Sequence, residues 1–150
     1  MRFFKLIMGS FFVILLTGCF GETYDYSPPT VTLTNPDDIE QEVKLAEANI
    51  YWQTSDKNYT KKTEDIQSLA KKQSKMELKA GQKAELHLEN GDFEPNGISV
   101  SVWKNAEKTD LKVKNDQSFN LPKNKGNYMI VVDIDTDKGH AQYVGDVVIQ

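Results

Sequence analysis

The chain has 150 residues, with 18 Lys and Arg against 22 Asp and Glu and a formal net charge of −4. A chain of this length predicts one domain with a hydrophobic core of its own. The acidic balance argues against a nucleic-acid-binding protein, because such proteins need a basic surface. The single cysteine, Cys19, excludes intramolecular disulfides and cysteine-based metal sites.

The first 18 residues have the pattern of a secretory signal peptide. Arg2 and Lys5 are the only charged residues before residue 22, and an almost wholly apolar run from 6 to 16 follows them. As a helix this run would be about 16 Å long, which is too short for a hydrocarbon core of about 30 Å. We therefore expect residues 1–18 to be a removable leader, and not a membrane-spanning helix.

The apolar run ends in Leu16-Thr17-Gly18-Cys19, which resembles the lipobox of bacterial lipoproteins. The resemblance implies that Cys19 carries diacylglycerol and becomes the mature N-terminus, anchored to the extracytoplasmic face of the cell membrane. The two acyl chains of this lipid, such as palmitate, would give stable anchoring, whereas one chain gives only marginal binding. The mature chain has many lysines and no arginine, which resembles the amino-acid usage of low-GC Gram-positive bacteria. The alternative is an ordinary secretory signal with an incidental cysteine.

Residues 19–30 are expected to tether the lipid to a domain formed by residues 31–150. Ser27-Pro28-Pro29 favours an extended, polyproline-like backbone that rises about 3.1 Å per residue. A tether of about ten residues would therefore hold the domain roughly 30 Å or less from the membrane. Cleavage before Cys19 would also remove Arg2 and Lys5, which takes the net charge from −4 to −6.

Alternation of apolar and polar residues predicts that most of the domain is β-strand, because a half-buried strand places every second side chain in the core. Turn clusters such as Asn35-Pro36-Asp37-Asp38 and Pro95-Asn96-Gly97 separate the segments. The alternating segments are 31–34, 76–78, 84–88, 98–102, 111–113, 119–121, 128–134 and 141–149.

Residues 42–54 form a strand candidate with a change of phase. Val43 and Leu45 share one face, whereas Ile50 and Trp52 share the other. Leu45 and Ile50 are five positions apart, and an odd spacing places two side chains on opposite faces of a regular strand. The pattern therefore predicts either a β-bulge or two separate strands.

The segment 55–75 is polar and lysine-rich and does not alternate. Thr63 can cap a helix, and a short amphipathic helix near 64–72 is predicted, covering an edge or an end of the domain. A solvated loop is the alternative. The apolar residues that support the helix fall at i, i+3 and i+4: Ile66, Leu69 and Ala70.

Repeated short strands with turns between them predict an all-β domain with one short helix, built as an antiparallel sandwich or barrel. Gly126-Asn127-Tyr128, followed by alternating apolar residues, resembles the penultimate strand of immunoglobulin-like β-sandwiches. That resemblance implies an immunoglobulin-like sandwich of seven or eight strands, without the disulfide that antibody domains carry.

The carboxylates Asp133, Asp135 and Asp137 have the spacing of a calcium loop, because calcium prefers several oxygen ligands. The register does not match an EF-hand, since Lys138 replaces the required glycine and Val144 replaces the final glutamate. The solvated tip of a hairpin explains the same residues. Further residues that could contribute to a looser calcium site or to a copper site are Asp92, Glu94, His87, His140, Met76 and Met129.

Catalytic motifs are lacking. Ser68-Leu69-Ala70-Lys71 matches Ser-x-x-Lys as a string, but the elements that accompany this motif in enzymes do not occur. We therefore expect a non-enzymatic lipoprotein without a cofactor, which binds a protein or ligand of the cell envelope. The leading candidate binding loop is the hairpin tip with Asp135 and Asp137, if that tip points away from the membrane. A small lipoprotein that binds a ligand, calcium or copper is the alternative.

Overall fold

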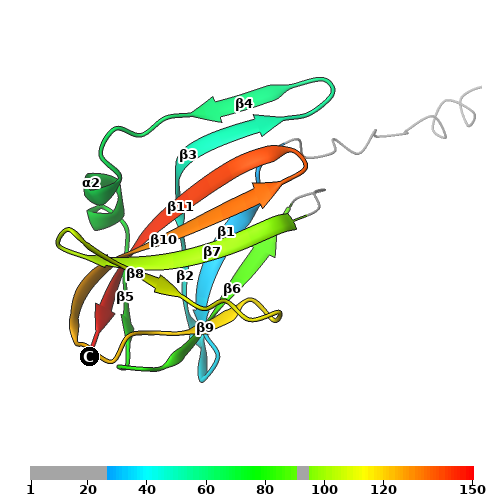
Figure 1. Cartoon of the computed structure of the whole chain (residues 1–150). Coiled ribbons are helices and arrows are strands. Elements are labelled where there is room, and N and C mark those ends of the chain that lie inside the picture. The colour runs from blue at the N-terminus through cyan, green and yellow to red at the C-terminus, as the bar shows by residue number, and fades with distance from the viewer. Residues whose placement is uncertain (1–26, 91–94) are drawn as a thin grey trace, which may run out of the picture.

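The computed structural model describes residues 27–90 and 95–150, which form two β-sheets packed face to face (Figure 1). The small sheet has the order β2 (Asp38–Lys44), β1 (Thr30–Asn35), β6 (Lys83–Glu89) and β9 (Ser118–Asn120). The large sheet has the order β4 (Asn58–Lys61), β3 (Ala46–Gln53), β11 (Gly139–Ile149), β10 (Gly126–Thr136), β7 (Pro95–Lys104) and β8 (Glu107–Leu111). A further strand, β5 (Lys75–Leu78), pairs with β11, and the helix α2 spans Ile66–Lys71.

The predicted β-sandwich is confirmed, and its pairing is antiparallel except at one place. Strand β5 runs parallel to β11, with Met76 opposite Val147. Pairing of parallel strands needs a crossover connection, and here the chain passes through β6 to β10 between β5 and β11. The likeness to immunoglobulin-like sandwiches in particular stays a prediction.

The main core lies between the two sheets. Val31 and Leu33 of β1 face Ile130 and Val132 of β10 across it, and all four side chains are fully buried. These residues follow the predicted alternation, because a strand with one face in the core buries every second side chain. The structure therefore confirms the faces of β1 and β10 that alternation predicted to be buried.

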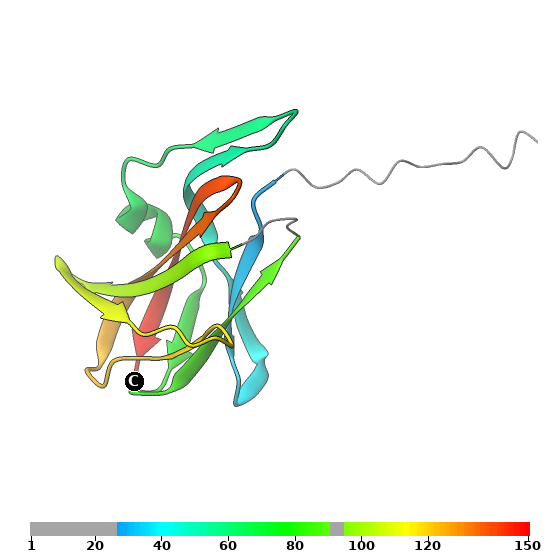
Figure 2. The ribbon, with the colours of Figure 1, turned by 45° about the vertical axis from the view of Figure 1, so that its right-hand side comes forward.

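A second cluster lies on the opposite face of the large sheet. There Ala70 of α2 packs with Val131 of β10 and Val144 of β11. Figures 1 and 2 show α2 beside β11, on the side of the large sheet that faces away from the small sheet. The predicted helix thus exists, but it covers a sheet face and not an edge or an end of the domain.

The change of phase in residues 42–54 has both predicted causes. The segment divides into β2 and β3 around Leu45, and the pairing of β3 with β11 shifts register between Ala141 and Tyr143. Since three steps along β3 oppose two along β11, Leu45 and Ile50 both reach the main core.

The predicted helix cap is wrong. Asp65 is the N-cap of α2, and its side chain accepts a hydrogen bond from the backbone N–H of Ser68 (3.0 Å). Thr63 binds to β3 instead, where its hydroxyl donates to the carbonyl of Ala48 (2.6 Å). Thr63 therefore holds the segment before the helix against the sheet.

The first described residues and the β10–β11 hairpin lie at the same end of the sandwich (Figures 1 and 2). Thr30, at the start of β1, pairs with Glu89 at the end of β6. Pro95, at the start of β7, pairs with Thr136 at the tip of β10. We refer to this as the entry end, because the chain enters the fold here.

Candidate functional site

The β10–β11 hairpin tip brings together the residues that suggested calcium. His140 lies between two carboxylates, with Nδ1 at 2.8 Å from Asp135 and Nε2 at 3.3 Å from Asp133. Asp133 also accepts a hydrogen bond from Gln142 (3.0 Å). The carboxylates of Asp133 and Asp135 therefore have protein partners on the neighbouring strand, and Asp137 lies in the turn beyond them, 3.6 Å from the Lys138 ammonium.

The residues considered for copper are far apart in the fold. Met76 is in the main core, while Met129 is in the cluster under α2. His87 lies on the outer face of the small sheet, and His140 lies on the hairpin of the large sheet. Asp92 and Glu94 lie outside the described residues. Within 27–90 and 95–150, no three His, Cys, Asp or Glu side chains are placed to hold a metal ion.

The position of the hairpin tip changes its interpretation. Asp135 and Asp137 lie at the entry end, where the first described residues begin the fold. If Cys19 is anchored to a membrane, this end faces the membrane. A binding loop with Asp135 and Asp137 that points away from the membrane stays a prediction, and the position of the tip at the entry end argues against it.

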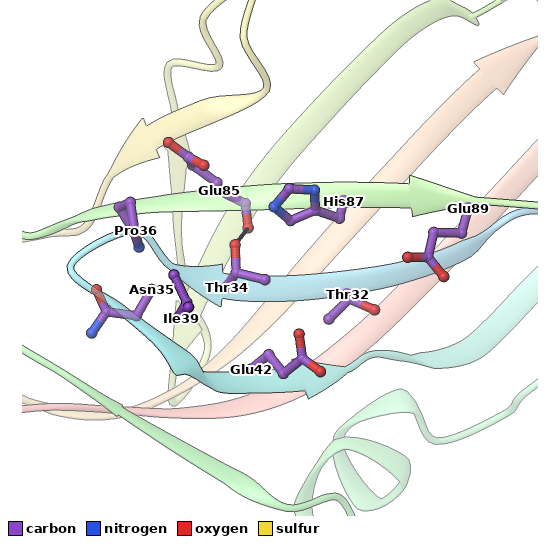
Figure 3. A pocket seen from close by; sticks show the side chains of 9 residues that line it. All are labelled: Thr32, Thr34, Asn35, Pro36, Ile39, Glu42, Glu85, His87 and Glu89. Carbon is purple, nitrogen blue, oxygen red and sulfur yellow. Dashed lines mark hydrogen bonds between the residues drawn. The ribbon is translucent and has the colours of Figure 1, made fainter.

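A shallow depression of about 640 Å³ covers the outer face of the small sheet (Figure 3). It contains Glu42 of β2 together with Glu85 and His87 of β6, and the hydroxyl of Thr34 donates to the Glu85 carbonyl (3.4 Å). Ile39 beside it is 86% exposed. Its glutamates are what the solvated face of a strand pair normally carries, because the opposite face forms the core.

A second surface depression lies between α2 and the strands β7, β10 and β11. Two adjoining hollows of about 600 and 160 Å³ share Trp103, Met129, Gln67, Lys71 and Asn105, and we call them together the α2 groove. Trp103 and Met129 are neighbours in the pairing of β7 with β10, and they form an apolar floor. Apolar surface with a few polar groups around it is typical of a binding site.

Hydrogen bonds hold the walls of the α2 groove in place. The indole N–H of Trp103 donates to the hydroxyl of Ser101 (3.2 Å), which orients the ring. The side chain of Gln67 donates to the carbonyl of Asn105 (3.4 Å), and so links α2 to the β7–β8 turn. At the rim, hydrogen bonds from Ser68 hold the pKa of the Asp65 carboxyl below its usual value. Asp65 therefore stays ionised to lower pH than a free aspartate.

The inner hollow also contains a carboxylate, that of Asp146 in β11. Its neighbours Gly145 and Val147 face the main core, so its side chain is on the α2 side, like that of Val144. Asp146 is 8% exposed. Within the part of the chain that the structure describes, no hydrogen bond or ion pair involves its carboxylate.

Sequence reasoning missed the α2 groove, although the sequence contains a signal for it. Alternation places Trp103 on the opposite face of its strand from Val102, and Val144 and Val148 on the second face of the last strand. A single charge, Asp146, interrupts that second apolar face between Val144 and Val148. Two apolar faces on one strand predict cover on both sides, and a charge between them is the anomaly that marks the groove.

Comparison with known proteins assigns no family. No model of a protein family matches the chain, and no curated protein matches it. In the described residues, no helix has the length and apolar character that crossing a membrane requires.

Proposed function

We propose that this chain is a lipoprotein, anchored through Cys19 to the extracytoplasmic face of the cell membrane, whose β-sandwich is a non-enzymatic binding module. The lipobox-like tetrapeptide Leu16–Cys19 supports the anchor. The α2 groove supports the binding function and is the observation that carries the proposal. It combines an aromatic side chain, an apolar floor and oriented polar groups, which is how ligand sites are usually built.

The arrangement of the fold is consistent with this proposal. The chain enters at the end with the β10–β11 hairpin, whereas α2 lies along the outer face of the large sheet (Figure 2). The expected tether of about ten residues, when extended, would leave roughly 30 Å for a partner to approach that face. The α2 groove is thus presented sideways to the space above the membrane.

The binding function is tested by site-specific photo-crosslinking with the full chain in intact cells. A photoreactive amino acid replaces Gln67 at the α2 groove and, as a control, Gln53 on β3, since both side chains are exposed. We expect a defined adduct from position 67 and none from position 53. Adding Trp103→Ala should reduce the adduct. Equal adducts from both positions would contradict a binding role of this groove.

The anchor is tested separately by cell fractionation. Replacing Cys19 by Ala removes the thiol that would carry the lipid, so the protein should leave the detergent phase and the membrane fraction. Cys19→Ser serves as a closer isostere that also lacks the thiol. If either variant partitions as the unmodified chain does, the lipoprotein proposal is wrong.

A further inference from the structure

Asp146 places a largely buried carboxylate in the inner hollow. Burial removes most of the water around an ionised group, and water still reaches this carboxylate through the hollow, because no fully buried side-chain oxygen of the described residues lacks a hydrogen-bond partner. Proteins break local rules of this kind mainly at functional or strained sites. At 8% exposed and facing the inner hollow, the carboxylate of Asp146 is in that situation.

Two lysines near Asp146 leave it unpaired. Lys75 lies opposite Asp146 in the pairing of β5 with β11, and Lys71 lines the same hollow. Both lysine residues are exposed, and the ion pairs among the described residues do not join either of them to Asp146. The carboxylate is thus open to a cation from outside the chain.

The charge of the α2 groove also favours a cation. Three carboxylates, those of Glu64, Asp65 and Asp146, line it against the single ammonium of Lys71. A negative surface attracts a positive group and holds it most strongly where the site is least hydrated. A metal ion would need several ligands, and the described residues place no such group here.

The shape of the groove indicates which chemical group the bound cation is attached to. The inner hollow of about 160 Å³ lies between Asp146 and Trp103, and it suits an unbranched aliphatic stem. Methylene groups next to an ammonium pack well on an indole ring and on a thioether. The amide side chains of Gln67 and Asn105 at the wider outer hollow can pair with peptide groups.

We propose that the α2 groove binds a lysine side chain of a partner polypeptide, with its ammonium paired to Asp146 and its stem packed on Trp103 and Met129. The proposal rests on the binding function proposed above and names the ligand chemistry of that same site. The peptide backbone of the partner lies in the outer hollow, next to the amides of Gln67 and Asn105.

The test is a titration of the ¹⁵N-labelled full chain in non-ionic detergent micelles, followed by NMR. The probe is Nα-acetyl-lysine amide, and the matched neutral probe is Nα,Nε-diacetyl-lysine amide. The indole N–H signal of Trp103 should shift with the charged probe, whereas that of Trp52, buried in the main core, should not. n-Butylamine, which has the four-carbon stem and the single ammonium without peptide groups, should bind more weakly.

Variants identify the role of Asp146. Asp146→Asn keeps the shape and removes the charge, so we expect the affinity for the charged probe to fall roughly tenfold or more. Asp135→Asn removes the same charge at the hairpin and should leave the affinity unchanged. The melting temperature of Asp146→Asn should equal or exceed that of the unmodified chain, because an unpaired buried charge is gone. A clear fall in melting temperature would show a structural role and overturn the inference.

The remaining outcomes separate this inference from the proposed function. If the neutral probe shifts Trp103 as strongly as the charged one, the groove binds ligands but Asp146 does not select an ammonium. If n-butylamine binds as tightly as the lysine derivative, the ligand is a free amine and the polypeptide partner is wrong. If adducts form at position 67 while no probe moves any groove signal, the binding function stands and the lysine inference fails.

Discussion

The hydroxyl of Tyr143 donates a hydrogen bond of 2.6 Å to the carbonyl oxygen of Pro29, 114 residues earlier in the chain. Tyr143 lies in β11 at the centre of the large sheet, and Pro29 directly precedes β1 of the small sheet. The bond therefore joins the entry point of the chain to the opposite sheet.

Replacing Tyr143 by Phe should lower the free energy of unfolding by about 1–2 kcal/mol, because the buried carbonyl of Pro29 loses its donor. Chemical denaturation of the two proteins measures the difference. Tyr51→Phe is the matched control, since the Tyr51 ring is 60% exposed and its loss of a hydroxyl should have little effect. Equal effects at both positions would contradict the importance of the Pro29 contact.

The same tyrosine predicts a dependence of stability on alkaline pH. Burial raises the pKa of the Tyr143 phenol well above its ordinary value of 10.0. Above about pH 10 the unfolded chain loses this proton while the folded chain keeps it, so the free energy of unfolding falls as pH rises, by at most about 1.4 kcal/mol per pH unit. Below pH 10 the contribution is fully present. Tyr143→Phe should lack this slope, and identical slopes in the two proteins would refute the assignment.

Gly139 follows the hairpin turn in a conformation that side chains oppose. Its φ is +139°, and a Cβ there would clash with the carbonyl oxygen of Tyr51 on the neighbouring strand. Gly139→Ala should therefore destabilise the fold by more than about 2 kcal/mol. Gly97→Ala is the control, because nothing lies within 4 Å of the position that its new methyl group would take and its φ is outside the left-handed region. Thermal melts of both variants provide the measurement.

Truncation in the main core should be far more costly than truncation on α2. Ile130→Ala and Val132→Ala each leave a cavity in the centre of β10, which should cost roughly 2–4 kcal/mol. Lys71→Ala and Lys72→Ala, at exposed positions, should each cost under about 0.5 kcal/mol. Similar losses at all four positions would contradict the packing described for β10 and α2.

The hairpin tip provides a test of the calcium alternative. The double variant Asp135→Ala, Asp137→Ala should fold normally and change stability by less than about 0.5 kcal/mol, because both side chains are exposed. Melting curves with and without calcium should coincide for both proteins. A rise in melting temperature with calcium that the double variant loses would establish an ion site at this hairpin.

Local patterns in the sequence are sufficient to predict the buried faces of the strands. Alternation in Val31 and Leu33, and in Ile130 and Val132, predicts which side chains the sandwich buries, because period-two burial is a local property of any half-buried strand. The helical spacing of Ile66, Leu69 and Ala70 similarly predicts α2. Where no side chain is buried, this signal vanishes: β4 at Asn58–Lys61 is exposed throughout, and alternation does not predict it.

Which elements contact one another does not follow from these local patterns. The parallel pairing of β5 with β11, the place of α2 on a sheet face and the location of the β10–β11 tip at the entry end all depend on contacts between distant segments. The α2 groove arises in the same way, since Gln67, Trp103 and Asp146 come from three separate parts of the chain. The free energy of such contacts comes from joint burial of surfaces that lie far apart in the sequence, so no local pattern contains it.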